Sequence, residues 1–167
     1  MKSNQYILGI DPGNRGACAL LSLDGTEIDW FKMPTRTSVP GTSKKRIDGF
    51  KLYNHLSNFN IVTCYIEKQA YKNAVLNANY GICMGVLDVL NIDFVAIQSS
   101  SWIKSLKVNA ELDDIKQGSD KAFTFYAFDK IFPSIELPMK GKERDDDIAD
   151  ACLIAWLCYL HIEKERD

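Results

Sequence analysis

The chain has 167 residues, of which 46% are hydrophobic and 25% are charged. This length and composition predict a single domain over residues 1–167 with a core large enough to fold alone, and they exclude a low-complexity chain. The net charge of −2 excludes a uniformly basic nucleic-acid-binding protein, although a local basic patch would still bind DNA.

The termini and the cysteines indicate a cytoplasmic protein with no membrane partner. A strand is expected after only five residues, which leaves no room for a signal peptide, and the apolar stretch 151–162 is too short to span a membrane. The five cysteines form no CxxC pair, and their odd number argues against a disulfide framework. A zinc site is disfavoured because only His55 and His161 could supply imidazole.

The first part of the chain predicts an antiparallel sheet. Strands are expected at 5–11, 16–23 and about 27–33, the last two joined by a hairpin turn at Asp24 and Gly25. Two prolines and a glycine predict a loop over 35–43, and the apolar spacing over 44–58 predicts an amphipathic helix.

The remainder alternates between strands and helices. Strands are expected at 61–67 and 93–97, and helices at 73–90, from Trp102 after a cap in 99–101, at 119–131 and at 145–163. Residues 108–118 predict a loop. We interpret the spacing of Gly81 and Gly85 as close packing of a helix on the sheet. The predicted fold is α/β, a mixed five-stranded sheet flanked by helices.

Four carboxylates stand where an isolated acid is hard to explain. Asp11 and Glu67 each end an apolar strand, and Asp147 and Asp150 lie near the start of an apolar helix. A buried acid is costly unless it is paired or bound to a cation. Convergence of the four would create an oxygen-lined Mg²⁺ site.

A purely structural role could also account for some of these acids. Asp-Pro-Gly at Asp11 is a common turn, and the helix macrodipole accounts for Asp145, Asp146 and Asp147. The macrodipole explains the deeper Asp150 poorly. Either Asp146 or Asp147 could share a helical face with Asp150, and we favour Asp147.

The acidic set matches a known hydrolytic chemistry. Two Mg²⁺ ions ~3.5–4 Å apart activate a water and stabilise the leaving oxygen of a phosphodiester. No His–Ser or Cys–His pairing at comparable positions predicts nucleophilic catalysis instead.

Three motifs in order resemble the RuvC family of Holliday junction resolvases, which have an RNase H-like fold: Gly9-Ile10-Asp11-Pro12-Gly13, Ile66-Glu67 and Asp147-Ile148-Ala149-Asp150-Ala151. The resemblance implies that Asp11, Glu67, Asp147 and Asp150 are the catalytic, metal-binding residues. It also implies two Mg²⁺ ions per site with Mn²⁺ as a substitute. It further implies a homodimer that nicks a four-way DNA junction symmetrically, with helix 73–90 as a candidate interface. Compact members of this family are common in bacteriophages.

DNA contacts follow from the same resemblance. Tyr71 is the candidate for stacking at the junction centre, next to the family-like Lys72 and Asn73, while Lys104, Lys107 and Lys121 are candidate phosphate contacts. Acids at Glu111, Asp113 and Asp114 depart from the Gly- and Lys-rich loop of bacterial members. Further cationic clusters are Lys44-Lys45-Arg46, which could be only a solvated helix start, and Lys140, Lys142 and Arg144.

Three alternatives to a resolvase remain. The first is a nuclease of the same fold that acts on flaps, branched DNA or RNA, and the second is a non-catalytic junction-binding protein. The third, an actin-like kinase or ATPase, is disfavoured because the chain is too short for a second lobe to enclose ATP.

Overall fold

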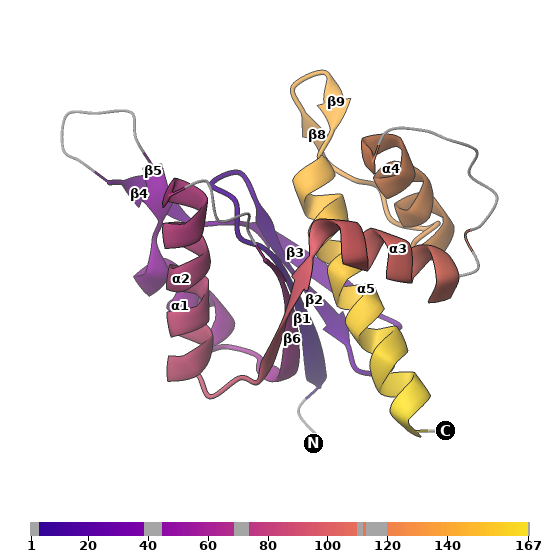
Figure 1. The fold of residues 1–167 in the computed structure, drawn as a ribbon, viewed down its shortest axis with the longest axis horizontal. Helices are drawn as coiled ribbons and strands as arrows, with labels where there is room; N and C mark the ends of the chain where they lie inside the picture. Colours follow the sequence, from indigo (N-terminus) through magenta and orange to yellow (C-terminus); the bar gives the residue numbers. More distant parts are fainter. Residues whose placement is uncertain (1–3, 39–44, 69–73, 110–111, 113–119, 167) are drawn as a thin grey trace.

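The computed structural model describes residues 4–38, 45–68, 74–109, 112 and 120–166. Its centre is a five-stranded sheet with the order β3-β2-β1-β6-β7 (Figure 1). The strands are β1 (Gln5–Asp11), β2 (Ala17–Ser22), β3 (Ile28–Lys32), β6 (Asn60–Lys68) and β7 (Phe94–Gln98). The first three strands pair antiparallel, whereas β1–β6 and β6–β7 are parallel. The predicted α/β class with a mixed five-stranded sheet is confirmed.

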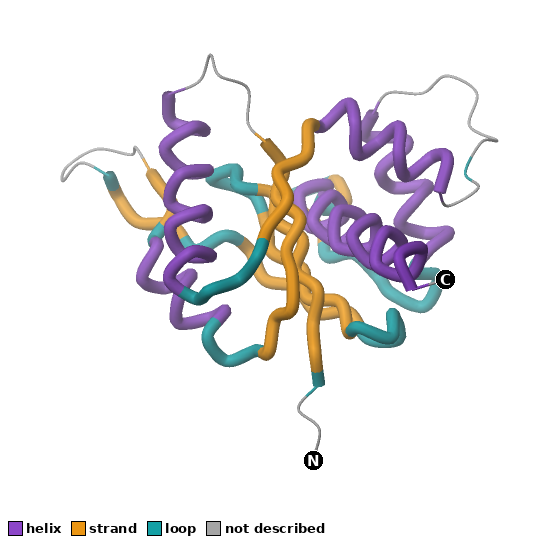
Figure 2. Tube along the Cα trace, turned by 60° about the horizontal axis from the view of Figure 1, so that its bottom comes forward, coloured by secondary structure: helices purple, strands orange, loops and turns teal. Residues whose placement is uncertain are grey.

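Within the described residues, five helices cover the two faces of this sheet (Figure 2). They are α1 (Gly49–Leu56), α2 (Ala74–Val89), α3 (Ser99–Asn109), α4 (Asp120–Ile131) and α5 (Asp146–Arg166). Helices α1 and α2 lie on one face, and α3, α4 and α5 on the other. No helix in the described ranges is long and apolar enough to cross a membrane.

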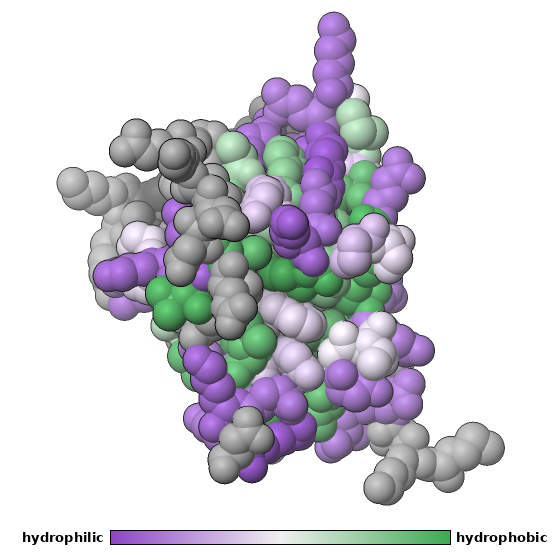
Figure 3. Space-filling model, turned by 90° about the vertical axis from the view of Figure 1, so that its right-hand side faces the viewer, coloured by the Kyte–Doolittle hydropathy of each residue, from purple (hydrophilic) through white to green (hydrophobic). Residues whose placement is uncertain are grey.

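Side-chain alternation along the strands divides the core in two. In β1, Ile7 packs against the α3–α4–α5 layer, whereas Leu8 and Ile10 pack against α1 and α2. In β6, Cys64 and Ile66 also face α1 and α2. Asp11 and Glu67 therefore lie on the α5 face. The outer side of that helical layer shows apolar side chains between polar ones (Figure 3).

The segment before α1 differs from the sequence prediction. Thr35–Thr37 and Lys45–Ile47 form strands β4 and β5 of a two-stranded ribbon, so the predicted loop 35–43 and helix 44–58 both have wrong boundaries. Helix α1 begins only after Asp48, whose carboxylate accepts a hydrogen bond from the Lys51 N–H at 3.2 Å. Ile47 is buried as a residue of strand β5, whereas Phe50, which was expected in the apolar stripe of the helix, is 73% exposed.

Three further details correct the prediction. Helix α3 begins at Ser99, so residues 99–101 form its first turn rather than a cap before Trp102, and it extends into the expected loop 108–118. A small hairpin, β8 (Met139–Lys140) and β9 (Glu143–Arg144), precedes α5. The interpretation of Gly81 and Gly85 is wrong: both are exposed, and an added Cβ would meet nothing within 4 Å at either.

Candidate active site

Strand register places charged residues in one row across the sheet. Asp11 pairs with Ala17, and Ala17 pairs with Lys32, so these three residues lie side by side on neighbouring strands. On the other side, Ile10 pairs with Ile66 in the parallel β6, so Glu67 follows beside Asp11. Directly paired residues point to the same face of a sheet, which here is the face covered by α5.

Helix α5 approaches this row closely because residue 9 is glycine. A Cβ at Gly9 would collide with the Ala151 carbonyl oxygen and would lie 2.5 Å from the Ala155 nitrogen. Asp147 precedes Ala151 by one helical turn, and Asp11 follows Gly9 on the same face of β1. The close packing therefore brings Asp147 toward Asp11.

Burial and mutual repulsion both act on the carboxylates of this row. Burial is the largest effect on Asp11 and, together with the charge of Asp147, raises its pKa to about 6. The Gly13 N–H donates a hydrogen bond to Asp11 Oδ1 at 3.1 Å and works against this shift. The nearby ammonium groups of Lys32 and Lys140 also lower the pKa of Asp11.

The pKa values of Glu67 and Asp150 are raised further than that of Asp11. Burial, followed by the charges of Asp11 and Asp150, raises the pKa of Glu67 to about 8. Burial also raises the pKa of Asp150 to about 7, with added repulsion from Asp11, Asp146 and Asp147. The Thr124 hydroxyl donates to Asp150 Oδ1 at 2.9 Å and partly offsets the shift. Carboxylates from β1, β6 and α5 thus act on one another as a single cluster.

A cavity of about 250 Å³ opens beside this cluster. Its lining residues are Glu67, Ser99, Trp102, Ile103, Lys121, Thr124, Asp146 and Asp150. The indole N–H of Trp102 is buried and is the one such side-chain group without a regular hydrogen bond among the described residues. Glu67 is the acceptor that this N–H faces, and their interaction lowers the pKa of Glu67, a smaller effect than burial.

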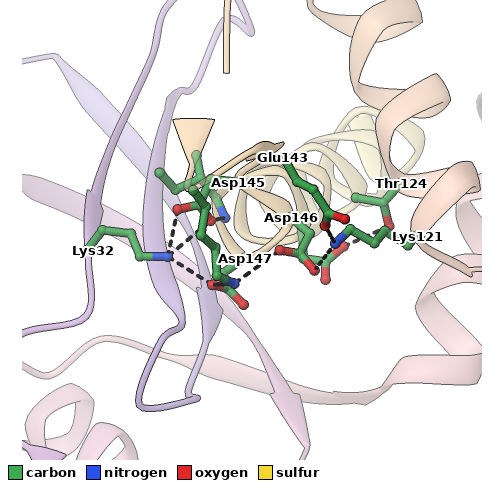
Figure 4. Close-up of polar contacts among 10 residues, drawn as sticks. Lys32, Lys121, Thr124, Glu143, Asp145, Asp146 and Asp147 are labelled. Atoms are coloured by element: carbon green, nitrogen blue, oxygen red, sulfur yellow. Dashed lines mark hydrogen bonds and ion pairs between the residues drawn. The ribbon is translucent and has the colours of Figure 1, made fainter. Parts of the chain in front are cut away.

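Lysines form ion pairs with the aspartates at the start of α5, and Figure 4 labels Lys32 and Lys121 among them. Lys32 Nζ lies 3.0 Å from Asp147 Oδ2 and 3.0 Å from Asp145 Oδ1. Lys140 Nζ lies 2.6 Å from Asp147 and 3.1 Å from Asp146, and Lys121 lies 3.4 Å from Asp146. Positive charge from β3, the β8–β9 hairpin and α4 thus offsets part of the carboxylate repulsion.

Asp145, Asp146 and Asp147 also have carboxylate oxygens within 4.8 Å of one another. Asp145 has a structural role, because its Oδ1 accepts a hydrogen bond from the Ile148 N–H at 3.2 Å and caps α5. Asp146 lines the cavity with Glu67, whereas Asp147 lies toward Asp11. Both therefore lie at the acidic cluster, and the choice of Asp147 over Asp146 stays a prediction.

This donor set fits a divalent cation. All the candidate ligands are carboxylate oxygens, which Mg²⁺ and Mn²⁺ prefer, and the described residues that line the cavity include no histidine or cysteine. The raised pKa values show that the cluster lacks enough positive charge for all its acids to ionise easily.

Among the residues predicted to contact DNA, Lys104, Lys107 and Lys121 belong to the described part of the chain. Tyr71, Lys72 and Asn73 lie outside the described residues. Lys121 lines the cavity and forms an ion pair with Glu143 at 2.5 Å. Lys107 Nζ lies 4.7 Å from the centre of the Phe123 ring, and Lys104 is exposed on α3.

Four residues of the site were not predicted as such: Lys32, Trp102, Thr124 and Lys140. Lys32 could have been found by extending the hairpin register from Asp11 through Ala17. The cationic cluster before α5 pointed toward Lys140 without assigning it a role. Thr124 and Trp102 carry no local signal, because only the packing of α3 and α4 against α5 brings them to the acids.

Sheet order and helical layers define an α/β protein with an RNase H-like fold. Two solved structures share it over 96% of both chains: Thermus thermophilus RuvC, with a TM-score of 0.57, and T. thermophilus RuvC in complex with Holliday junction substrate, with a TM-score of 0.53. The sequence identity is 14% in both comparisons, so the similarity concerns the fold. No family model and no curated protein matches the sequence.

Proposed function

We propose that this protein is a Mg²⁺-dependent, structure-selective endonuclease that resolves four-way DNA junctions by paired symmetric nicks. The observation that carries the proposal is the meeting of Asp11, Glu67, Asp147 and Asp150, which come from three separate elements. Similarity in fold to a RuvC structure solved with a Holliday junction substrate supports the choice of branched DNA. DNA recombination, repair or phage DNA processing would use this activity.

Asp11, Glu67, Asp147 and Asp150 would hold the metal, and Mn²⁺ would replace Mg²⁺. Bound Mg²⁺ would supply Lewis-acid stabilisation of phosphate charge and a water of lowered pKa. The chain's own contribution is orientation. Thr124 fixes one oxygen of Asp150, and the Gly13 N–H fixes one oxygen of Asp11. The Trp102 N–H lowers the pKa of Glu67 and so favours the ionised form of this carboxylate.

DNA would reach the cavity past cationic side chains. Lys121 already lines it, and Lys104 and Lys107 lie on the neighbouring α3, so these three remain our candidates for phosphate contacts. Tyr71, Lys72 and Asn73 remain candidates for contacts at the junction centre.

A symmetric cut requires two copies of the site, and we propose that α2 forms the dimer interface. Gly81, Gly85 and Val89 recur at helical spacing along α2, and all three are exposed. Small side chains allow two helix axes to approach closely. The open space around Gly81 and Gly85 is therefore consistent with packing against a second copy rather than against the sheet.

The test uses a labelled four-way junction, a flap, a linear duplex and an RNA–DNA hybrid of matched sequence, each with Mg²⁺ or EDTA. We expect paired symmetric nicks in the junction alone, with no cleavage in EDTA. Asp147→Asn should reduce cleavage by roughly a hundred-fold or more and leave junction binding intact. Preferred cutting of flaps or hybrid would reassign the substrate, whereas tight junction binding without cutting would indicate a binding protein.

A further inference from the structure

A second candidate site lies beside the Asp11 loop, on the α2 side of the sheet. It is a groove of about 800 Å³ between the β4–β5 ribbon, the start of α2 and the loop that follows β1. Its lining residues are Asn14, Arg15, Thr35, Ser38, Lys45, Arg46, Ala74, Val75 and Ala78. Three of these nine residues are cationic and none is acidic.

The cations of this groove differ from those at the acidic cluster. Lys32, Lys121 and Lys140 are all neutralised by carboxylates. In contrast, the side chains of Arg15, Lys45 and Arg46 form no ion pair or hydrogen bond within the described part of the chain, and neither does that of Arg36 on the adjoining strand β4. Their charge is therefore available to an external anion.

The ribbon also carries an electrostatic conflict. Arg36 and Arg46 are directly opposite each other in the β4–β5 pairing, and both are exposed. Like charges at opposed positions destabilise a sheet by roughly 0.2–1 kcal/mol. The conflict is unfavourable unless an anion bridges the two guanidinium groups.

A buried amide fixes this groove relative to Asp11. Asn79 of α2 is 0% exposed, and its side chain donates to Asn14 Oδ1 at 2.8 Å while accepting from the Ile47 N–H at 3.0 Å. One side chain thus joins the loop after Asp11, strand β5 and helix α2. Asn14 and Arg15 of the groove belong to the loop that follows Asp11, so a ligand in the groove lies near the end of β1 that carries this acid.

We infer that the groove lined by Arg15, Lys45 and Arg46, together with Arg36 opposite Arg46 on the ribbon, binds the phosphate backbone of a DNA duplex arm and directs it toward Asp11. The inference rests on the proposed function for the identity of the nucleic acid. Guanidinium groups bind phosphate in bidentate geometry, and such contacts position DNA without reading its sequence. The small side chains of Ala74 and Ala78 leave room for the sugar–phosphate chain.

The test measures binding of the full-length protein to a four-way junction and to a linear duplex, in EDTA, over a range of salt concentrations. Arg36→Gln/Arg46→Gln should weaken junction binding roughly ten-fold and reduce the slope of log Kd against log salt by about 2. The same variant should unfold at an equal or higher temperature, because the repulsion between the two arginines is removed. Arg166→Gln is the control, since Arg166 is an exposed arginine at the far end of α5 (Figure 1).

The outcomes separate this inference from the proposed function. Unchanged affinity and salt slope in the variant would overturn the groove assignment even if the wild-type protein cleaves junctions. Groove-dependent binding to duplex by a protein that cuts no junction would support the groove and refute the resolvase. Absence of DNA binding by the wild-type protein would overturn both.

Discussion

At the scale of single residues, the acidic cluster is balanced by ammonium groups rather than by buried hydrogen bonds alone. Asp147 contacts both Lys32 of β3 and Lys140 of the β8–β9 hairpin. A metal ion that binds Asp147 must share its oxygens with these lysines or displace them. The lysines therefore set the strength of metal binding as well as the stability of the metal-free protein.

Lys140→Met should strengthen metal binding because it removes this competitor. A partly exposed ion pair contributes up to about 1 kcal/mol, which corresponds to roughly a five-fold lower Kd for Mn²⁺. Titration calorimetry with Mn²⁺ and no DNA measures the effect directly. The neighbouring Lys142→Met serves as the control, since Lys142 is exposed and makes no ion pair among the described residues. Weaker Mn²⁺ binding by Lys140→Met would instead show that Lys140 holds Asp147 in position for the ion.

The raised pKa values predict how stability depends on pH. Glu67 has a pKa of about 8 in the folded protein against an ordinary value near 4.5, so the folded state binds the extra proton between these values. Stability of the metal-free protein should therefore fall as the pH rises from about 5 to about 8. Thermal unfolding in EDTA should show a decrease on the order of several degrees, and Mg²⁺ should reverse it. Glu67→Gln should reduce the pH dependence, with the remainder due to Asp11 and Asp150; an unchanged profile would show that Glu67 is not one of the titrating groups.

At the scale of elements, the sequence predicted those parts whose pattern is strong and local. Long apolar runs predicted β1, β2, β6 and α5 close to their observed bounds. The β4–β5 ribbon was missed because its strands are three residues long and mostly polar, so no periodicity distinguishes them from a loop or a helix start. For the same reason, Lys45 and Arg46 were considered as charged residues at the solvated start of a helix.

The site was predicted only as far as its carboxylates. Acids at the ends of apolar elements can be recognised in the sequence, because a buried acid is costly unless it is paired or bound to a cation. The residues that orient them are not, since Thr124 and Trp102 reach the cluster through tertiary packing. Gly81 and Gly85 illustrate the opposite error: a spacing that permits close packing does not say which surface packs there.

The packing of α5 on β1 offers a test of how elements position the acids. Gly9→Ala would force α5 away from the sheet, because the new methyl group meets backbone atoms of Ala151 and Ala155 that cannot rotate aside. Overpacking of this kind costs about 1–3 kcal/mol. We expect lower stability in chemical unfolding together with weaker Mn²⁺ binding, since Asp147 and Asp150 move with the helix. Normal Mn²⁺ affinity in a folded Gly9→Ala protein would show that the metal does not depend on the β1–α5 contact.

At the scale of the whole molecule, the features assigned to function gather at one end. The carboxyl ends of β1 and β6 carry the acids, and the β4–β5 ribbon and the β8–β9 hairpin both project from this end (Figure 1). Parallel strands place their carboxyl ends at one edge, and this edge is the usual ligand-binding position in open α/β sheets. Helix α2 lies beside the same edge, so a dimer formed through α2 would set the distance between two active sites.

Gly85→Arg tests that arrangement. An arginine on the exposed stripe of α2 should separate the two copies through its bulk and charge. It should not destabilise the single chain, since an added Cβ meets no atom within 4 Å and arginine favours a helix more than glycine does. Sedimentation velocity should show a dimer for the wild-type protein and a monomer for the variant at micromolar concentration. Asn54→Arg on the exposed side of α1 adds the same charge elsewhere and should leave the dimer unchanged.

A wild-type monomer throughout the concentration series, or a dimer that survives Gly85→Arg, would exclude α2 as the interface. In the second case, paired cleavage would have to be organised through another surface.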